Sequence, residues 1–190
     1  MKKKLFYTFI FAGIAAQFVM LTSNIVLHEM TLRKGEVHRF QTAPVDPFDA
    51  FRGQYVALNF NAFDTSNWRS HADDLSKGKK WCYVQIGTDT NGLAFIERVS
   101  LKRDVPSPYL KVRISKWRRG VELPFTRYYM PERLAPEAEK AYLEANRSGK
   151  RNAAAVVRIW KGRAVIEDLE IEGVPVREFL ERRKQEGSTE

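Results

Sequence analysis

The chain has few of the residues from which many functional sites are built. Cys82 is the single cysteine among 190 residues, so neither an intramolecular disulfide nor a zinc site made of cysteines can form. The three histidines are isolated from one another, and no glycine-rich loop has the spacing of a phosphate-binding motif. Gly and Pro number only 11 and 8, which excludes collagen and low-complexity linkers. These absences predict no cofactor and no metal site.

Long hydrophobic runs are also absent, except at the N-terminus. Residues 5–27 carry no formal charge and follow Lys2, Lys3 and Lys4. As a helix this run rises roughly 34 Å, and the hydrocarbon core of a bilayer is about 30 Å thick. Lysines favour the cytoplasmic side. We therefore expect a cytoplasmic N-terminus over 1–4, a transmembrane signal anchor over 5–27 that contacts the lipid bilayer, and an extracytoplasmic domain over 28–190.

Two alternatives to a retained anchor stay open. Gly13-Ile14-Ala15 has the small-x-small pattern of a signal peptide cleavage site, although the apolar run continues beyond it. The second alternative is a core helix of a soluble domain, and the absence of a charged face on 5–27 argues against it. A lipoprotein anchor is excluded because Cys82 lies far from the N-terminus.

Positive charge exceeds negative charge, with 32 Lys and Arg against 23 Asp and Glu. Nucleic acid is a natural partner of a basic cytoplasmic protein, but the expected topology argues against it, so no nucleic acid partner is expected. Contact with anionic lipid headgroups beside a tethered domain is a second interpretation. The third is a solvated surface of mixed charge, because the basic residues are scattered along the sequence.

Beyond residue 36 the hydrophobic pattern has a period of two, which is typical of half-buried strands. The clearest case is Leu110, Val112 and Ile114, which alternate with polar residues. Expected strands cover 36–42, 55–60, 81–86, 93–102, 110–115, 122–129, 153–160 and 165–171. In the last of these we expect one shared face for Val165, Leu169 and Ile171.

Two segments with helical spacing interrupt the strands. Ala138, Ala141, Tyr142 and Ala145 predict a helix from 131 or 132 to 147, with Pro136 either in its first turn or at a break. A second helix is expected over 175–184. The spacing of the strands suits antiparallel meanders. The expected fold class is α+β, with one N-terminal transmembrane helix followed by a single, mainly antiparallel β domain that has one or two short helices.

The segment 44–60 reads PVDPFDAFRGQYVALNF and combines several turn signals. Asp46 can cap a single helical turn, Pro47 suits its first position, and Gly53 can end it with a positive φ. A strand is then expected from Tyr55. The local prediction is a capped turn that leads into a strand.

This segment resembles the motif of the GDYXXLXY family, which consists of bacterial membrane-anchored proteins of unknown function. The motif positions are Asp46, Pro47, Arg52, Gly53, Tyr55, Leu58 and Phe60, of which Gly53, Tyr55 and Leu58 match the family residue by residue. Gln54 stands where the family has Asp, and Phe60 where it has Tyr. Further similarity covers 127–132 and 162–173. The resemblance implies a single-pass protein of the bacterial inner membrane, and association with a polytopic membrane protein.

Few residues suggest catalysis, and no catalytic residue is assigned. Residues 30–60 contain no serine, so a nucleophile of the signal-peptidase type is absent. Cys82 lies on an apolar strand face and is expected to be buried rather than nucleophilic. Glu132 is most simply a first-turn helix carboxylate, and it could also reach Arg127 or Arg52. Candidates for a pocket are Asp49, Arg127 and Glu132.

The favoured hypothesis is a non-catalytic, membrane-anchored extracytoplasmic protein that binds a membrane or envelope partner. The alternative is an envelope enzyme or ligand-binding protein, with a site that forms only in the fold around 46–60. A deep pocket that gathers Asp49, Arg52, Tyr55 and Glu132 would favour the alternative.

Overall fold

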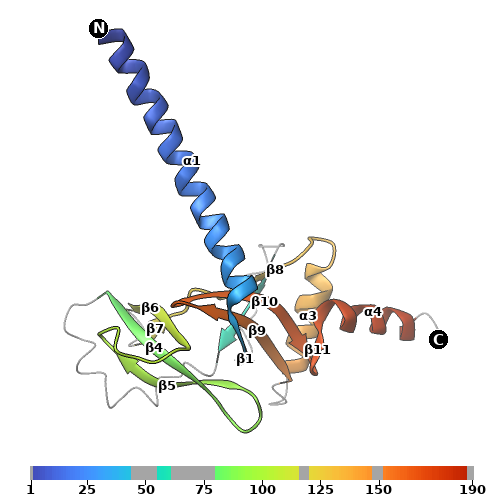
Figure 1. Ribbon diagram of the computed structural model, residues 1–190. Coiled ribbons are helices and arrows are strands. Elements are labelled where there is room, and N and C mark those ends of the chain that lie inside the picture. Colours follow the sequence, from blue (N-terminus) through green and yellow to red (C-terminus); the bar gives the residue numbers. More distant parts are fainter. Residues whose placement is uncertain (1, 44–54, 61–79, 116–119, 147–151, 188–190) are drawn as a thin grey trace.

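The computed structural model describes residues 2–43, 55–60, 80–115, 120–146 and 152–187. In these ranges a long helix projects from a domain of three β-sheets and two short helices (Figure 1). All pairs of named strands are antiparallel. The expected α+β class is confirmed: an N-terminal apolar helix precedes a mainly antiparallel β domain with two short helices.

Helix α1 (Lys2–Lys34) contains the apolar run and continues beyond its expected end at residue 27. Every residue from 6 to 26 is exposed, because this part of the helix stands away from the domain (Figure 1). It is the one helix in the described part of the chain that is long and apolar enough to cross a membrane. Residues 28–34 add about 10 Å of helix between the apolar run and the domain.

Five strands form the largest sheet, in the order β11-β10-β9-β1-β3. They are β1 (Glu36–Ala43), β3 (Asn59–Phe60), β9 (Ala153–Trp160), β10 (Arg163–Ile171) and β11 (Val174–Pro175). β9 is central, and its bounds agree with the expected strand. Its alternate side chains belong to the hydrophobic core: Ala153, Ala155, Val157 and Ile159.

A β-bulge changes the phase of β10. Its register against β9 shifts between Ile166 and Asp168, which leaves Glu167 as an extra residue. Ile166 packs against the core before the bulge, and Leu169 is in the core after it. The expectation that Val165 shares the face of Leu169 is therefore wrong, because the inserted residue inverts the alternation.

Four strands form the second sheet, in the order β5-β4-β6-β7. They are β4 (Trp81–Thr88), β5 (Ala94–Ser100), β6 (Tyr109–Ser115) and β7 (Gly120–Glu122). The alternation predicted for the middle strands is confirmed. Their buried face consists of Cys82, Val84, Ile86, Leu110 and Val112.

Two expected strands are each divided between sheets. The segment 55–60 forms β2 (Tyr55–Ala57), which pairs with β8 (Arg127–Tyr129), and β3, which pairs with β1. The segment 122–129 is divided between β7 and β8, and Pro124 between them has no N–H for a ladder. The two expectations of a continuous strand are wrong, since local alternation does not show where the chain leaves one sheet for another.

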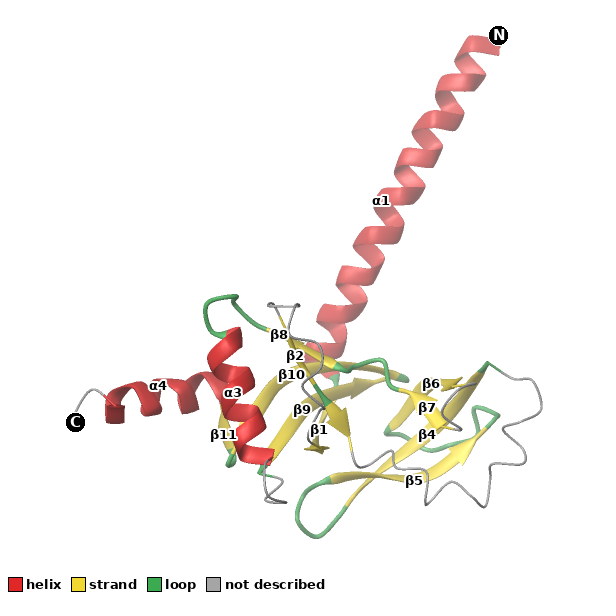
Figure 2. Cartoon of the chain, turned by 180° about the vertical axis from the view of Figure 1, so that it is seen from behind, coloured by secondary structure: helices red, strands yellow, loops and turns green. Residues whose placement is uncertain are grey.

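Helices α3 (Ala135–Asn146) and α4 (Val176–Gly187) lie at one end of the domain, opposite the four-stranded sheet (Figure 2). α3 begins at Ala135 rather than at 131 or 132, because Pro136 occupies the first turn. Its helical stripe is buried as predicted and consists of Ala138, Ala141, Tyr142 and Ala145.

Candidate functional site

The segment 44–60, which resembles the family motif, is described by the structure from Tyr55 onward, where it pairs with β8. Tyr55 lies opposite Tyr129 in the antiparallel pair. The amide of Leu58 then donates a hydrogen bond of 2.9 Å to the carbonyl oxygen of Thr126. The stretches 55–60 and 127–132, which both carry the family resemblance, are therefore neighbours in the fold.

The motif side chains Leu58 and Phe60 lie in the core. Each is 6% exposed. The Phe60 ring meets the Phe125 ring at 5.3 Å between centroids and the Phe40 ring at 6.2 Å, both edge to face. Aromatic pairs of this geometry stabilise a core beyond their buried area. This part of the motif is consequently a packing element.

Tyr128 connects the motif strand pair to the bulge of β10. Its hydroxyl donates a hydrogen bond of 2.9 Å to Oδ1 of Asp168. The same carboxylate oxygen accepts the amide of Leu169 at 2.8 Å. Burial, together with the hydrogen bond to Asp168, raises the pKa of Tyr128 to about 12. The phenol therefore stays a neutral donor near pH 7 and holds β8 against β10.

The other predicted site residues are either exposed or outside the described ranges. Arg127 lies on β8 and Glu132 in the turn before α3, and both are exposed. Neither lines the cavity between α3 and α4. Outside the described residues lie Asp46, Pro47, Asp49, Arg52 and Gly53. The pocket around 46–60 stays a prediction.

The end of α1 is fastened to the outer face of the five-stranded sheet. Thr31 is fully buried, and only Gly35 separates the helix from β1. Nη1 of Arg158 donates to the carbonyl oxygen of Gly35 at 3.2 Å. Nε and Nη2 of Arg158 donate to the two carboxylate oxygens of Glu167 at 2.8 and 2.9 Å. No pattern in the sequence indicated this junction, because it joins residues of three different elements.

The outer face of β4 and β6 carries aromatic and basic side chains together. Nζ of Lys111 and Cζ of Arg113 each lie 5.3 Å from the ring centroid of Trp81, within the range of cation–π contacts. Similar contacts occur over Tyr109 and Trp160. We call this surface the cation–aromatic face; it consists of Trp81, Tyr83, Arg103, Tyr109, Lys111, Arg113, Trp160 and Lys161.

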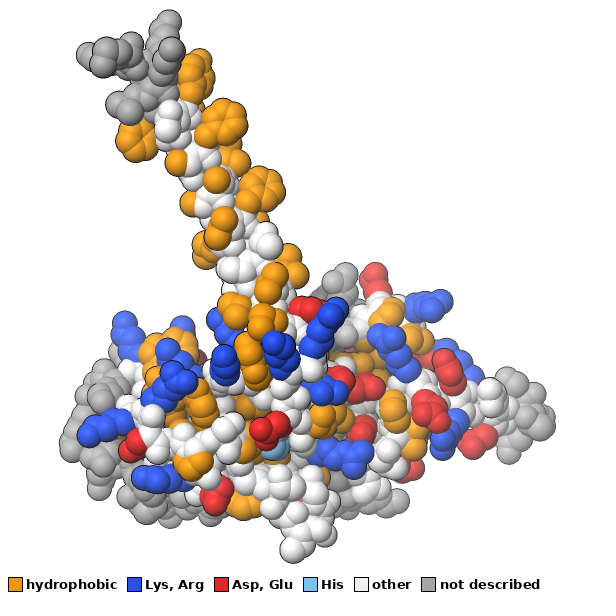
Figure 3. All heavy atoms as spheres, in the orientation of Figure 1, with side chains coloured by type: hydrophobic (Ala, Val, Ile, Leu, Met, Phe, Trp, Pro, Cys, Tyr) orange, Lys and Arg blue, Asp and Glu red, His pale blue; other side chains and the backbone are white. Residues whose placement is uncertain are grey.

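The turn between β9 and β10 closes one side of the cation–aromatic face. The amide of Lys111 donates a hydrogen bond of 2.9 Å to the carbonyl oxygen of Gly162. A Cβ on Gly162 would lie 2.8 Å from the Tyr109 ring, and its φ of 81° favours glycine. Figure 3 shows Lys and Arg side chains, with hydrophobic ones between them, over β6 and β10 beside the base of α1.

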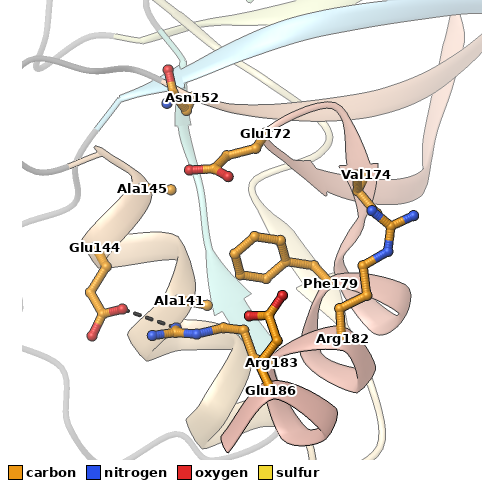
Figure 4. Close-up of a pocket in the computed structure, with 10 residues that line it drawn as sticks. All are labelled: Ala141, Glu144, Ala145, Asn152, Glu172, Val174, Phe179, Arg182, Arg183 and Glu186. Atoms are coloured by element: carbon orange, nitrogen blue, oxygen red, sulfur yellow. Dashed lines mark hydrogen bonds and ion pairs between the residues drawn. The ribbon is translucent and has the colours of Figure 1, made fainter.

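A cavity of about 540 Å³ lies between α3 and α4 (Figure 4). The Phe179 ring points into it, and Nη1 of Arg183 reaches Oε2 of Glu144 at 3.0 Å. Arg182, on its rim, is paired with Glu178. The two guanidinium groups that line the cavity are therefore already held by carboxylates. Its charges are of both signs and do not converge on one point.

Two further titratable side chains, Cys82 and His38, bear on the expectations about catalysis and metal binding. Cys82 is fully buried, and burial raises the pKa of its thiol to about 12, which is unsuited to a nucleophile. His38 is 8% exposed on β1, and burial lowers its pKa although Glu36 lies 4.0 Å away. Among the described residues, no three His, Cys, Asp or Glu side chains lie close enough together to hold a metal ion.

The fold and these surfaces define a class of protein in which one apolar helix leads directly into an α+β domain. A family model, described as GDYXXLXY protein, matches residues 17–169. The chain belongs to the GDYXXLXY family. No curated protein and no solved structure matches the chain.

Proposed function

We propose that this chain is a single-pass protein of the bacterial inner membrane whose extracytoplasmic domain binds a membrane or envelope partner and carries out no catalysis. One observation carries the proposal. Residues 6–26 of α1 are exposed, uncharged and mostly apolar, and they lie outside the domain. An exposed apolar surface of this size needs a lipid or protein environment, because its hydration is unfavourable.

The direction of insertion is proposed from the lysines that precede the apolar run. Positive charge next to a transmembrane segment favours the cytoplasmic side. In this orientation the domain lies beyond the membrane, and the junction at Gly35 holds it close to the bilayer. The family resemblance favours a polytopic membrane protein as the partner.

The test is expression of the full chain with a C-terminal epitope in bacterial cells. We expect the protein to stay in the membrane pellet after alkaline carbonate, and a protease added to spheroplasts to remove the epitope. Its intact mass should include residues 1–15, because the anchor is retained. A chain released by carbonate, a protected epitope or a cleaved N-terminus would each contradict the proposal.

The partner is tested by purification of the tagged full chain in a mild detergent. A multispanning membrane protein should be recovered in a constant ratio with the chain. Recovery of the chain without any stoichiometric membrane protein would argue against this part of the proposal.

A further inference from the structure

We propose that the cation–aromatic face binds the anionic phospholipid headgroups of the membrane that holds α1. This inference rests on the proposed function, because it requires α1 to lie in a bilayer. Beyond the proposed function, it specifies which surface of the domain touches lipid and that this surface selects negatively charged lipid.

The first argument is the position of the face relative to the bilayer. The apolar run ends at Leu27, and residues 28–34 continue the helix for about 10 Å. The headgroup layer of one leaflet is roughly 5–8 Å thick. Figures 1 and 2 both show β6 on the side of the domain from which α1 rises, and β5 farther away. The outer surface of β6 therefore lies near headgroup level.

Because the junction is short, the cation–aromatic face keeps its position relative to the bilayer. Only Gly35 lies between α1 and β1, and its carbonyl oxygen is bound by Arg158. A domain on a long flexible linker would sample many orientations. Here the same surface stays turned toward the bilayer, so even weak contacts act at a high effective concentration.

The second argument is that carboxylates in the described part of the chain leave most cations of the face without an ion pair. Among the described residues, Arg103, Lys111 and Lys161 form no ion pair with a carboxylate. Glu122 lies 4.0 Å from Arg113, and both side chains are more than half exposed, so this pair is weak. The surface keeps a net positive charge that an anionic membrane attracts.

The third argument is the combination of these cations with aromatic rings. Trp81 is 44% exposed, although a ring of its size is usually more buried. Trp and Tyr side chains are enriched at membrane–water interfaces, where the ring lies among the headgroups. The cations lie on β6, in the segment before it and in the turn between β9 and β10 instead of converging on one point. This arrangement fits a planar array of phosphates better than a single free anion.

The test uses the full-length chain, reconstituted with its domain outward in vesicles. One vesicle preparation contains phosphatidylcholine alone, and the other also contains phosphatidylglycerol. The rates of lysine acetylation at Lys111 and Lys161 are measured by mass spectrometry, with exposed Lys140 on α3 as the internal control. We expect phosphatidylglycerol to protect Lys111 and Lys161 and to leave Lys140 unchanged. High salt should remove the protection, because it screens the attraction.

A matched pair of variants tests the role of charge. Arg113→Gln removes a cation of the face and keeps both reporter lysines, and it should weaken the protection by about fivefold. Arg182→Gln makes the same change of charge on α4, where the side chain is paired with Glu178. The protection of Lys111 should be unaltered in this control.

Three results would overturn the proposal while α1 stays integral to the membrane. They are equal acetylation in the two kinds of vesicle, an equal effect of the two variants, and protection in native membranes without protection in phosphatidylglycerol vesicles. The last result would assign the face to a protein partner. Failure of the chain to stay in any vesicle would instead contradict the proposed function.

Discussion

Nη1 of Arg158 donates a hydrogen bond of 3.2 Å to the carbonyl oxygen of Gly35 and thereby ties β9 to the residue that follows α1. The same guanidinium holds the carboxylate of Glu167, the extra residue of the β10 bulge. Three elements therefore determine the direction in which α1 leaves the domain. The extra residue of the bulge therefore takes part in this junction.

Gly35→Ala should damage this junction. A Cβ at this position would lie 2.4 Å from the carbonyl oxygen of Thr31 and 2.9 Å from the Cβ of Arg158. Backbone atoms cannot move away cheaply, so we expect the free energy of unfolding to fall by about 1–3 kcal/mol. The melting temperature of the full chain in detergent measures the loss. The control is Gly13→Ala, which meets nothing within 4 Å; equal melting temperatures would contradict the prediction.

Phe60→Ala should cost far more than truncation of an exposed ring. Phe60 packs edge to face with Phe40 and Phe125, and its removal leaves a cavity in the core. We expect a loss of about 3–5 kcal/mol in the free energy of unfolding, measured by chemical denaturation. Phe95→Ala, at a ring that is 40% exposed, should lose clearly less. Similar losses in the two variants would show that the motif segment is not part of the core.

Tyr128→Phe should remove a contribution to stability that the natural chain loses only at alkaline pH. Burial and the bond to Asp168 raise the pKa of Tyr128 from 10.0 to about 12 in the folded chain. A raised pKa stabilises the folded state below pH 10, and this contribution is lost as the pH rises toward 12. The lost hydrogen bond should cost about 1.5–3 kcal/mol near pH 7, because its acceptor is charged.

The measurement for Tyr128 is a titration of tyrosinate absorbance in the folded protein. One phenol that ionises near pH 12 should be present in the natural chain and absent in the variant. A variant that instead loses one phenol ionising near pH 10.0 would show that Tyr128 ionises like an exposed tyrosine.

His38 should make the domain less stable in weak acid. Its ordinary pKa is 6.5, and burial lowers this pKa in the folded chain, while Glu36 acts in the opposite direction. The unfolded chain then binds more protons below pH 6.5, so stability is full above that pH and declines as the pH falls. His38→Leu should flatten the decline in melting temperature between neutral and weakly acidic pH. A decline that is the same in the natural chain and in His38→Leu would contradict the assignment.

Several elements could be predicted from the sequence because their signal is local. The alternation in β6 predicted that strand and its buried face, since neighbouring side chains in a strand point to opposite sides, and the bounds expected for β9 were also correct. Pro136 lies in the first turn of α3, one of the two places that its missing N–H allowed. The candidate site was harder to predict. The motif residues Leu58 and Phe60 were singled out for the family resemblance, and they are core residues.

By itself, the sequence determined the apolar helix, the phase of the regular strands and the family. The signal for each comes from residues that are near one another along the chain. Only the tertiary structure decided that Tyr128 meets Asp168, that Glu167 meets Arg158, and that Lys111 lies beside the turn at Gly162. These contacts depend on which strands pair and where a bulge shifts their register, and such choices are made by packing of the whole domain.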